Sequence, residues 1–89
     1  MKYDLIEYEV WGNKKEGFEI NNLFRVVKGI EIDDNDTDKD IVKKLKEVGY
    51  LKNTVRMNQM TIESQSEGMI EFYERKDYKP SFRLERVEW

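Results

Sequence analysis

The stretch of sequence from residue 31 to residue 50 reads EIDDNDTDKDIVKKLKEVGY. Five aspartates lie within eight consecutive positions, 33 to 40, and apolar residues mixed with lysines follow them. Such a run is typical of a calcium loop, of an acidic docking surface, or of the beginning of a helix. The residue types at fixed distances from the aspartates distinguish these interpretations.

A dedicated calcium loop requires glycine at its sixth position and a bidentate glutamate at its twelfth. If Asp34 is taken as the first ligand, Lys39 and Leu45 occupy those two positions. Both residues that identify the motif are therefore missing, and the sequence predicts no metal site in this stretch.

The same stretch matches the beginning of an amphipathic helix. Thr37 and Asp40 have the spacing of a capping pair, and carboxylates favour the positive end of the helix dipole. Gly49 lies where a left-handed residue would end the helix. The apolar stripe expected at helical spacing consists of Ile41, Leu45 and Val48, with Val42 beside them.

The segments on both sides of this helix alternate between apolar and polar residues, as half-buried strands do. The expected strands occupy residues 3–11, 18–27, 59–64, 69–74 and 82–89. One helix cannot bury its stripe alone, so residues 1–89 should form a single α+β domain. We expect the helix to pack on a mainly antiparallel sheet of about five strands, in the order ββαβββ. A β-grasp-like sheet, whose first and last strands pair in parallel, remains an alternative.

The alternation also predicts which side of each strand faces the helix. The side expected under the helix carries Ile6, Tyr8, Phe72 and Leu84. The opposite side carries Tyr3, Leu5, Trp11, Met69, Tyr73, Val87 and Trp89. In the second strand Phe18, Ile20, Phe24 and Val26 should share one side. Asn22 interrupts that side, which predicts a bulge or a break in the strand near residues 21 and 22.

The composition excludes several chemistries. The chain has 89 residues without cysteine or histidine, so disulfides, thiolate metal sites and the commonest general base are absent. No histidine can activate the serines, and the isolated glycines form no phosphate-binding loop. A net charge of −3 gives no strong field for nucleic acid or membrane. We therefore expect a protein that is not an enzyme and uses no cofactor or metal.

The first eleven residues contain one basic residue, several acids and no continuous apolar run. This pattern fits neither a signal peptide nor a membrane span. We therefore expect a cytoplasmic protein that does not associate with membranes.

The side of the sheet away from the helix is the first candidate for a binding surface. Aromatic side chains among charges are typical of protein interfaces, although scattered apolar residues are also ordinary on any surface. The residues expected to contact a protein partner are Tyr3, Trp11, Tyr73 and Trp89. A small open sheet also has unpaired edges, so a homodimer is possible. In that dimer Glu7 and Glu9 of one chain would meet Arg75 or Arg83 of the other.

A second candidate surface is the segment YERKDYKPSFR at residues 73–83. Basic groups for phosphates and aromatic faces for bases are the composition of a nucleic-acid surface. The residues concerned are Arg75, Lys76, Tyr78, Lys79 and Arg83. Three nearby acids, Glu74, Asp77 and Glu85, offset much of this charge, so nucleic acid is the less favoured partner.

Two segments, EVWGNKKEGFEINN at residues 9–22 and LKEVGYLK at residues 45–52, carry a family resemblance. They resemble small uncharacterised proteins of phages and integrative elements of low-GC bacteria. The resemblance implies an accessory protein that binds a host or element-encoded partner, and it assigns no functional residues. The sequence thus predicts a small non-catalytic binding module that acts through protein contacts, with nucleic-acid binding as the alternative.

Overall fold

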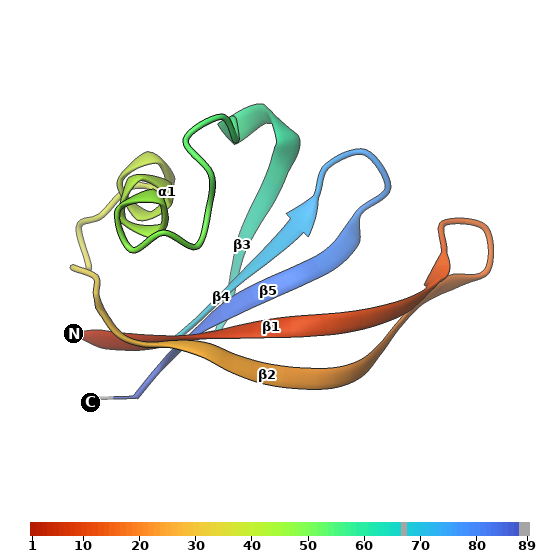
Figure 1. The fold of residues 1–89 in the computed structure, drawn as a ribbon, viewed down its shortest axis with the longest axis horizontal. Helices are drawn as coiled ribbons and strands as arrows, with labels where there is room; N and C mark the ends of the chain where they lie inside the picture. The colour runs from red at the N-terminus through yellow and green to blue at the C-terminus, as the bar shows by residue number, and fades with distance from the viewer. Residues whose placement is uncertain (67, 88–89) are drawn as a thin grey trace.

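The structure, a computed structural model, describes residues 1–66 and 68–87. Five strands and one α-helix form an α+β fold, as expected from the sequence (Figure 1). The elements are β1 (Lys2–Asn13), β2 (Gly17–Glu31), α1 (Asp38–Glu47), the 3-10 helix η1 (Met57–Gln59), β3 (Met60–Ser66), β4 (Met69–Glu74) and β5 (Lys79–Arg86).

The strands form one sheet in the order β2-β1-β5-β4-β3, and all the pairs between neighbours are antiparallel. The first and last strands pair with each other, with Leu5 opposite Leu84, but they run in opposite directions. The β-grasp-like parallel pairing is therefore wrong. The connection that carries α1 brings the chain to the far edge of the sheet at β3, and the hairpins that follow fix the direction of β5.

Helix α1 begins and ends with the caps that the sequence predicts. The Asp40 backbone N–H donates to Thr37 Oγ1 at 3.2 Å, and the Thr37 backbone N–H donates to Asp40 Oδ2 at 3.0 Å. The hydrogen bond from the Thr37 backbone N–H lowers the pKa of Asp40 because it favours the charged form of the carboxylate. At the other end, the backbone N–H of Tyr50 closes the last turn on the carbonyl of Leu45 at 3.0 Å, with Gly49 just beyond the helix.

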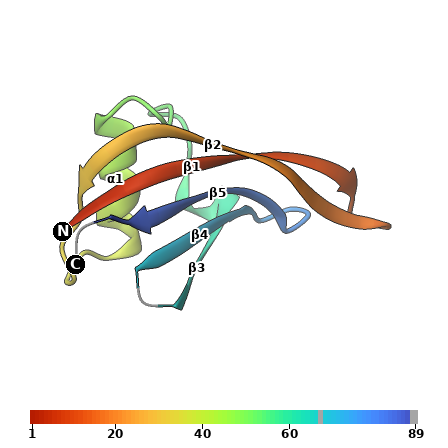
Figure 2. The ribbon, with the colours of Figure 1, turned by 90° about the horizontal axis from the view of Figure 1, so that it is seen from below.

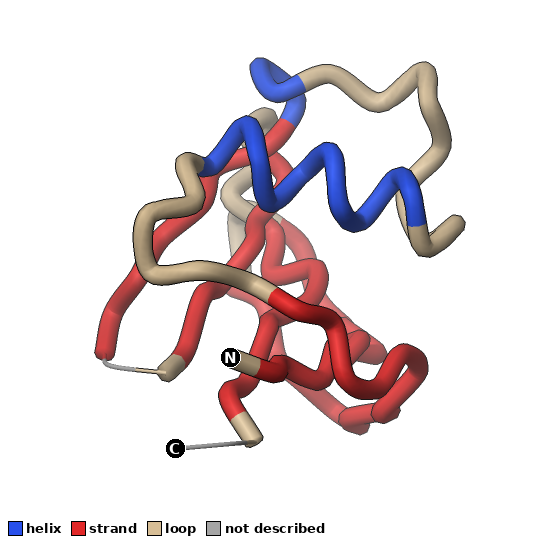
Figure 3. The backbone as a smooth tube through the Cα atoms, turned by 90° about the vertical axis from the view of Figure 1, so that its left-hand side faces the viewer, coloured by secondary structure: helices blue, strands red, loops and turns tan. Residues whose placement is uncertain are grey.

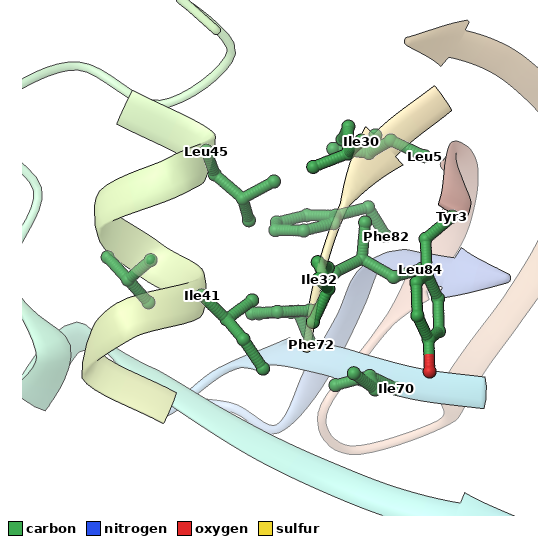
Figure 4. Packing of buried hydrophobic residues seen from close by; sticks show 11 residues of the cluster. Tyr3, Leu5, Ile30, Ile32, Ile41, Leu45, Ile70, Phe72, Phe82 and Leu84 are labelled. Atoms are coloured by element: carbon green, nitrogen blue, oxygen red, sulfur yellow. The ribbon is translucent and has the colours of Figure 1, made fainter. Parts of the chain in front are cut away.

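The core lies between α1 and one face of the sheet (Figures 3 and 4). The helix contributes Ile41, Val42 and Leu45. The sheet and the chain that leaves it contribute Tyr3, Leu5, Ile30, Ile32, Ile70, Phe72, Phe82 and Leu84. Val48, which was expected in the apolar stripe, is 47% exposed, because α1 ends at Glu47 and Val48 is its C-terminal cap.

The predicted sides are correct for β4 and β5 and wrong for β1. Tyr3 and Leu5 are in the core under α1, whereas Ile6 and Tyr8 point to the other side of the sheet. Residues directly opposite in an antiparallel pair share a face, and Leu5 lies opposite the buried Leu84. Leu5 and Ile6 are both apolar, so alternation along the strand does not decide which of them faces the helix.

The loop after α1 is attached to the sheet by Tyr50. Its ring meets that of Phe82 edge-on, with 5.0 Å between the ring centres. Its hydroxyl donates to Glu7 Oε1 at 2.8 Å, and burial raises the pKa of the Tyr50 phenol. Glu7 therefore has a structural partner on the helix side of the sheet.

Candidate binding surface

The hairpin of β1 and β2 extends beyond the rest of the sheet (Figures 1 and 2). The pairing of β1 with β5 covers residues 3–7, whereas its pairing with β2 continues as far as Asn13 opposite Gly17. We call residues 8–24 the arm. Within the described residues, this two-stranded arm pairs with no third strand.

One face of the arm is almost entirely apolar. The cross-strand pairs on this face are Tyr8 with Leu23, Val10 with Ile20 and Gly12 with Phe18. Leu23 is 50% exposed and Ile20 is 42% exposed. We call the five side chains Tyr8, Val10, Phe18, Ile20 and Leu23 the arm strip. The strip continues the sheet face that points away from α1, and it contributes nothing to the core beneath the helix.

The other face of the arm also exposes large side chains, but it mixes them with polar groups. Trp11 is 58% exposed and lies opposite Glu19. Phe24 is 47% exposed and lies opposite Glu7. This face is therefore less continuous than the arm strip.

A bulge in β2 separates the apolar residues onto two faces. Glu9 lies opposite Asn22, but the next residue of β1 lies opposite Ile20, so Asn21 has no counterpart. The Asn21 amide donates to Glu9 Oε1 at 2.9 Å. The bulge predicted at this place is confirmed. It shifts the alternation by one residue, so Ile20 and Phe24 point to opposite faces instead of sharing one.

Strand β2 is an edge strand, and two further irregularities interrupt it closer to the core. At one of them the carboxylate of Asp4, which is only 8% exposed, accepts from the Gly29 backbone N–H at 3.0 Å. The other carboxylate oxygen accepts from Arg25 Nε at 2.9 Å. Bulges hinder the addition of another strand at an edge. The side-chain face of the arm is therefore a better candidate contact surface than its backbone edge.

The structure places only one of the four predicted partner-binding residues on a described surface. Trp11 is exposed, but Tyr3 is 7% exposed and belongs to the core beneath α1. Tyr73 is 9% exposed because its ring stacks on that of Tyr78, with 4.3 Å between the ring centres. Trp89 lies outside the described residues.

The groups expected to form ion pairs between two chains have partners within one chain. Glu7 accepts from Tyr50, and Glu9 accepts from Asn21. The Arg83 guanidinium lies 5.9 Å from the centre of the Tyr8 ring and 3.3 Å from a carboxylate oxygen of Glu85. These contacts give the acids of β1 and Arg83 structural functions.

The predicted nucleic-acid residues do not form one surface. Arg75 and Lys76 lie in the turn after β4 and line a hollow beside η1, whereas Arg83 lies on the sheet face away from α1. One face of the Tyr78 ring is covered by Tyr73, and the Tyr78 hydroxyl donates to Glu63 Oε2 at 2.6 Å. Lys79 begins β5. The stacked tyrosine offers at most one ring face to a base.

In the part of the chain that the structure describes, no three acidic side chains lie close enough together to hold a metal ion. One aspartate of the acidic stretch, Asp36, bonds instead to the Lys44 ammonium and to the Asp33 backbone N–H. These bonds lower the pKa of Asp36 and raise that of Lys44. The described helices also include none with the length and apolar character needed to cross a bilayer.

Three comparisons with known proteins found no match for this chain. No protein-family model matches the chain, and neither does any curated protein or any solved structure. The arm strip must therefore be interpreted from its own chemistry.

Sequence reasoning missed Ile20, Leu23 and Phe24 as surface residues. A signal was present: residues 18–27 contain two charges, Glu19 and Arg25, among six large apolar side chains. A strand buried on one face needs about half of its residues apolar. The excess indicates apolar side chains on both faces.

Proposed function

We propose that this chain is a small non-catalytic binding module that contacts a protein partner through the arm strip. The observation that carries the proposal is the exposure of Ile20 and Leu23 on a two-stranded hairpin that does not support the core. Contiguous exposed apolar side chains with no structural purpose are typical of interaction sites. The resemblance noted above suggests the setting, a cytoplasmic accessory protein of a phage or integrative element.

The energetics favour such a contact. Complete burial of one leucine or isoleucine side chain contributes ~1.5–3 kcal/mol. The arm is already ordered by its cross-strand pairing, so binding need not order a disordered loop at further entropic cost. Burial of the rest of the arm strip together with these two anchors would be needed to offset the loss of translational and rotational freedom on association.

The test compares two variants as baits for proteins from the native cell. Ile20→Ser/Leu23→Ser removes the centre of the arm strip. Val48→Ser is the matched control, because Val48 is 47% exposed but lies at the end of α1. A partner captured by the wild type should be retained by the control and reduced about tenfold or more by the arm variant. Both variants should keep their stability within about 0.5 kcal/mol, since exposed positions are replaced.

Two results would contradict the proposal. The first is a partner that binds the arm variant as well as the wild type. The second is equal loss of the partner in the arm variant and in Val48→Ser, because a general effect of lost surface area would then explain both.

Nucleic acid stays the alternative partner class, although no arrangement of residues 73–83 favours it. A labelled oligonucleotide titrated at low and at moderate salt tests it, because phosphate contacts weaken steeply with salt. Salt-sensitive binding that is lost in Lys76→Glu/Lys79→Glu would favour this alternative over the protein contact.

A further inference from the structure

A hollow of about 460 Å³ opens between the beginning of α1 and the beginnings of β1 and β4. Its floor is apolar and is formed by Tyr3, Ile32, Ile41 and Ile70, which face one another in Figure 4. Its rim carries the carboxylates of Asp33, Asp34, Asp36 and Asp38. The hollow therefore combines an apolar floor with a strongly acidic rim.

The hydroxyl of Tyr3 supplies a second, independent feature. Tyr3 is only 7% exposed, and its hydroxyl end lies beside Ile70, another residue of the floor (Figure 4). Among the described residues, this hydroxyl has no hydrogen-bond partner. Every side-chain oxygen or nitrogen of these residues that is fully enclosed does have one. The Tyr3 oxygen is therefore not fully enclosed, and Tyr3 is one of the residues that line the hollow. A ligand in the hollow could therefore form a hydrogen bond with a hydroxyl that has no partner within the described part of the protein.

The rim keeps an excess of negative charge. The Lys44 ammonium pairs with Asp36, and Met1, which also lines the hollow, bonds through its amino group to Glu31 at 2.6 Å. Arg86 is the other cationic group of the lining. Within the described residues Asp33, Asp34 and Asp38 form no ion pair.

We propose that this hollow binds a linear polyamine, an aliphatic chain that bears several ammonium groups. The aspartates are spread around the rim and do not converge as metal ligands do, which suits charges separated by methylene segments. The methylenes would lie on the isoleucine floor, the ammonium groups would bond to the rim carboxylates, and one of them would donate to the Tyr3 hydroxyl. The site lies away from the arm and does not depend on the function proposed there.

A lysine side chain of a bound protein offers the same alkylammonium chemistry. The experiment therefore uses two probes at low salt, spermidine and the peptide acetyl-Lys-Ala-Lys-amide, followed by calorimetry and by amide chemical shifts. Shifts should concentrate at Tyr3, residues 32–41 and Ile70. If the peptide binds at these residues as tightly as spermidine or more tightly, the result supports the site. It then assigns the bound alkylammonium group to a protein segment.

Three variants separate the site from general attraction to an acidic protein. Asp34→Asn/Asp38→Asn removes two rim charges, and Glu16→Gln/Glu19→Gln removes two charges from the arm, so both have the same net charge. The rim pair should weaken spermidine binding about tenfold, and the arm pair should change it less than about twofold. Tyr3→Phe, which removes one hydroxyl, should weaken it about threefold or more.

Several results would overturn the proposal. One is the same loss of affinity in the two charge-matched pairs; another is unchanged affinity in both Tyr3→Phe and the rim pair. A further contradicting result comes from magnesium ions at the same concentration of charge as spermidine. If magnesium shifts the amide signals of the same residues as strongly, the hollow is only an acidic surface that attracts cations. If the rim pair lowers the melting temperature, Asp34→Asn alone is used, because Asp34 lies outside α1.

Discussion

Thr37 controls the beginning of α1 through a single hydroxyl. Its Oγ1 accepts from the Asp40 backbone N–H, an orphan donor that no helical carbonyl satisfies. Thr37→Ala should therefore lower the free energy of unfolding by roughly 0.5–2 kcal/mol. Urea denaturation measures this loss, with Thr54→Ala as a control at an exposed threonine outside the helix. Equal stabilities of the two variants would show that the cap contributes nothing.

Asp4 is a buried carboxylate that serves two donors, the Gly29 backbone N–H and the Arg25 guanidinium. Asp4→Ala leaves a backbone N–H at a bulge without its acceptor, which costs roughly 1–3 kcal/mol of unfolding free energy. Asp4→Asn keeps an acceptor oxygen and should cost less. Thermal or urea unfolding of both variants checks the order. An asparagine variant less stable than the alanine variant would contradict this function of the carboxylate.

The acidic stretch and α1 act together as one capped element, not as a metal loop. We expect excess calcium, compared with a chelator, to leave the melting temperature unchanged, because Lys39 and Leu45 occupy the diagnostic ligand positions. A site formed only in the folded state would add ~2.7 kcal/mol at a hundred times its dissociation constant. Differential scanning calorimetry distinguishes the two cases, and a calcium-dependent rise in melting temperature would show that the helix interpretation is incomplete.

The turn of the arm contains two glycines that should respond differently to the same substitution. Gly12 and Gly17 have φ angles of +101° and +97°. A Cβ on Gly12 would lie 2.2 Å from the Gly17 carbonyl oxygen, whereas a Cβ on Gly17 would meet nothing within 4 Å. Both alanine variants carry backbone strain of about 1 kcal/mol or more, and Gly12→Ala adds a clash with the backbone.

Amide hydrogen exchange along the arm measures this difference locally. Gly12→Ala should speed exchange of the arm amides more than Gly17→Ala, while amides of α1 and β5 stay protected, because the arm opens without unfolding the core. Equal exchange in the two variants, or loss of protection throughout the sheet, would contradict the view of the arm as a separate unit.

The arm strip is an exposed apolar surface of the whole molecule, so self-association through it is a direct consequence to test. A two-fold dimer would place arm strip against arm strip, each copy burying the same residues. We expect the mass to rise from monomer toward dimer with concentration, and the association to weaken in Ile20→Ser and in Leu23→Ser, which both lie in the arm strip. Light scattering on a size-exclusion column over a wide dilution range measures both effects.

Val48→Ser is the control, because it removes a side chain of similar exposure at the end of α1. Monomer mass at every concentration would exclude the dimer. A dimer that persists in both arm variants would keep the association but move it to another surface.

Local chemistry determined much of this protein from the sequence alone. The Thr37–Asp40 cap, the left-handed Gly49 just beyond the end of α1, the helical and alternating segments that define the α+β class, and the bulge beside Asn22 each depend on residues within a few positions of one another. Hydrogen bonds at a helix end and the period of an alternating strand involve near neighbours, so the sequence displays them directly.

Contacts between residues distant along the chain decided the rest. Leu5 faces the helix because it lies opposite Leu84, and Tyr73 is covered because Tyr78 returns to stack on it. The arm exists because β5 pairs with β1 only as far as Glu7. Alternation gives each strand two sides without saying which is inward, and strand order sets how far each pairing extends. The pairing register between distant strands therefore places Tyr3 in the floor of the acidic hollow. The same kind of long-range pairing leaves Ile20 and Leu23 on the surface.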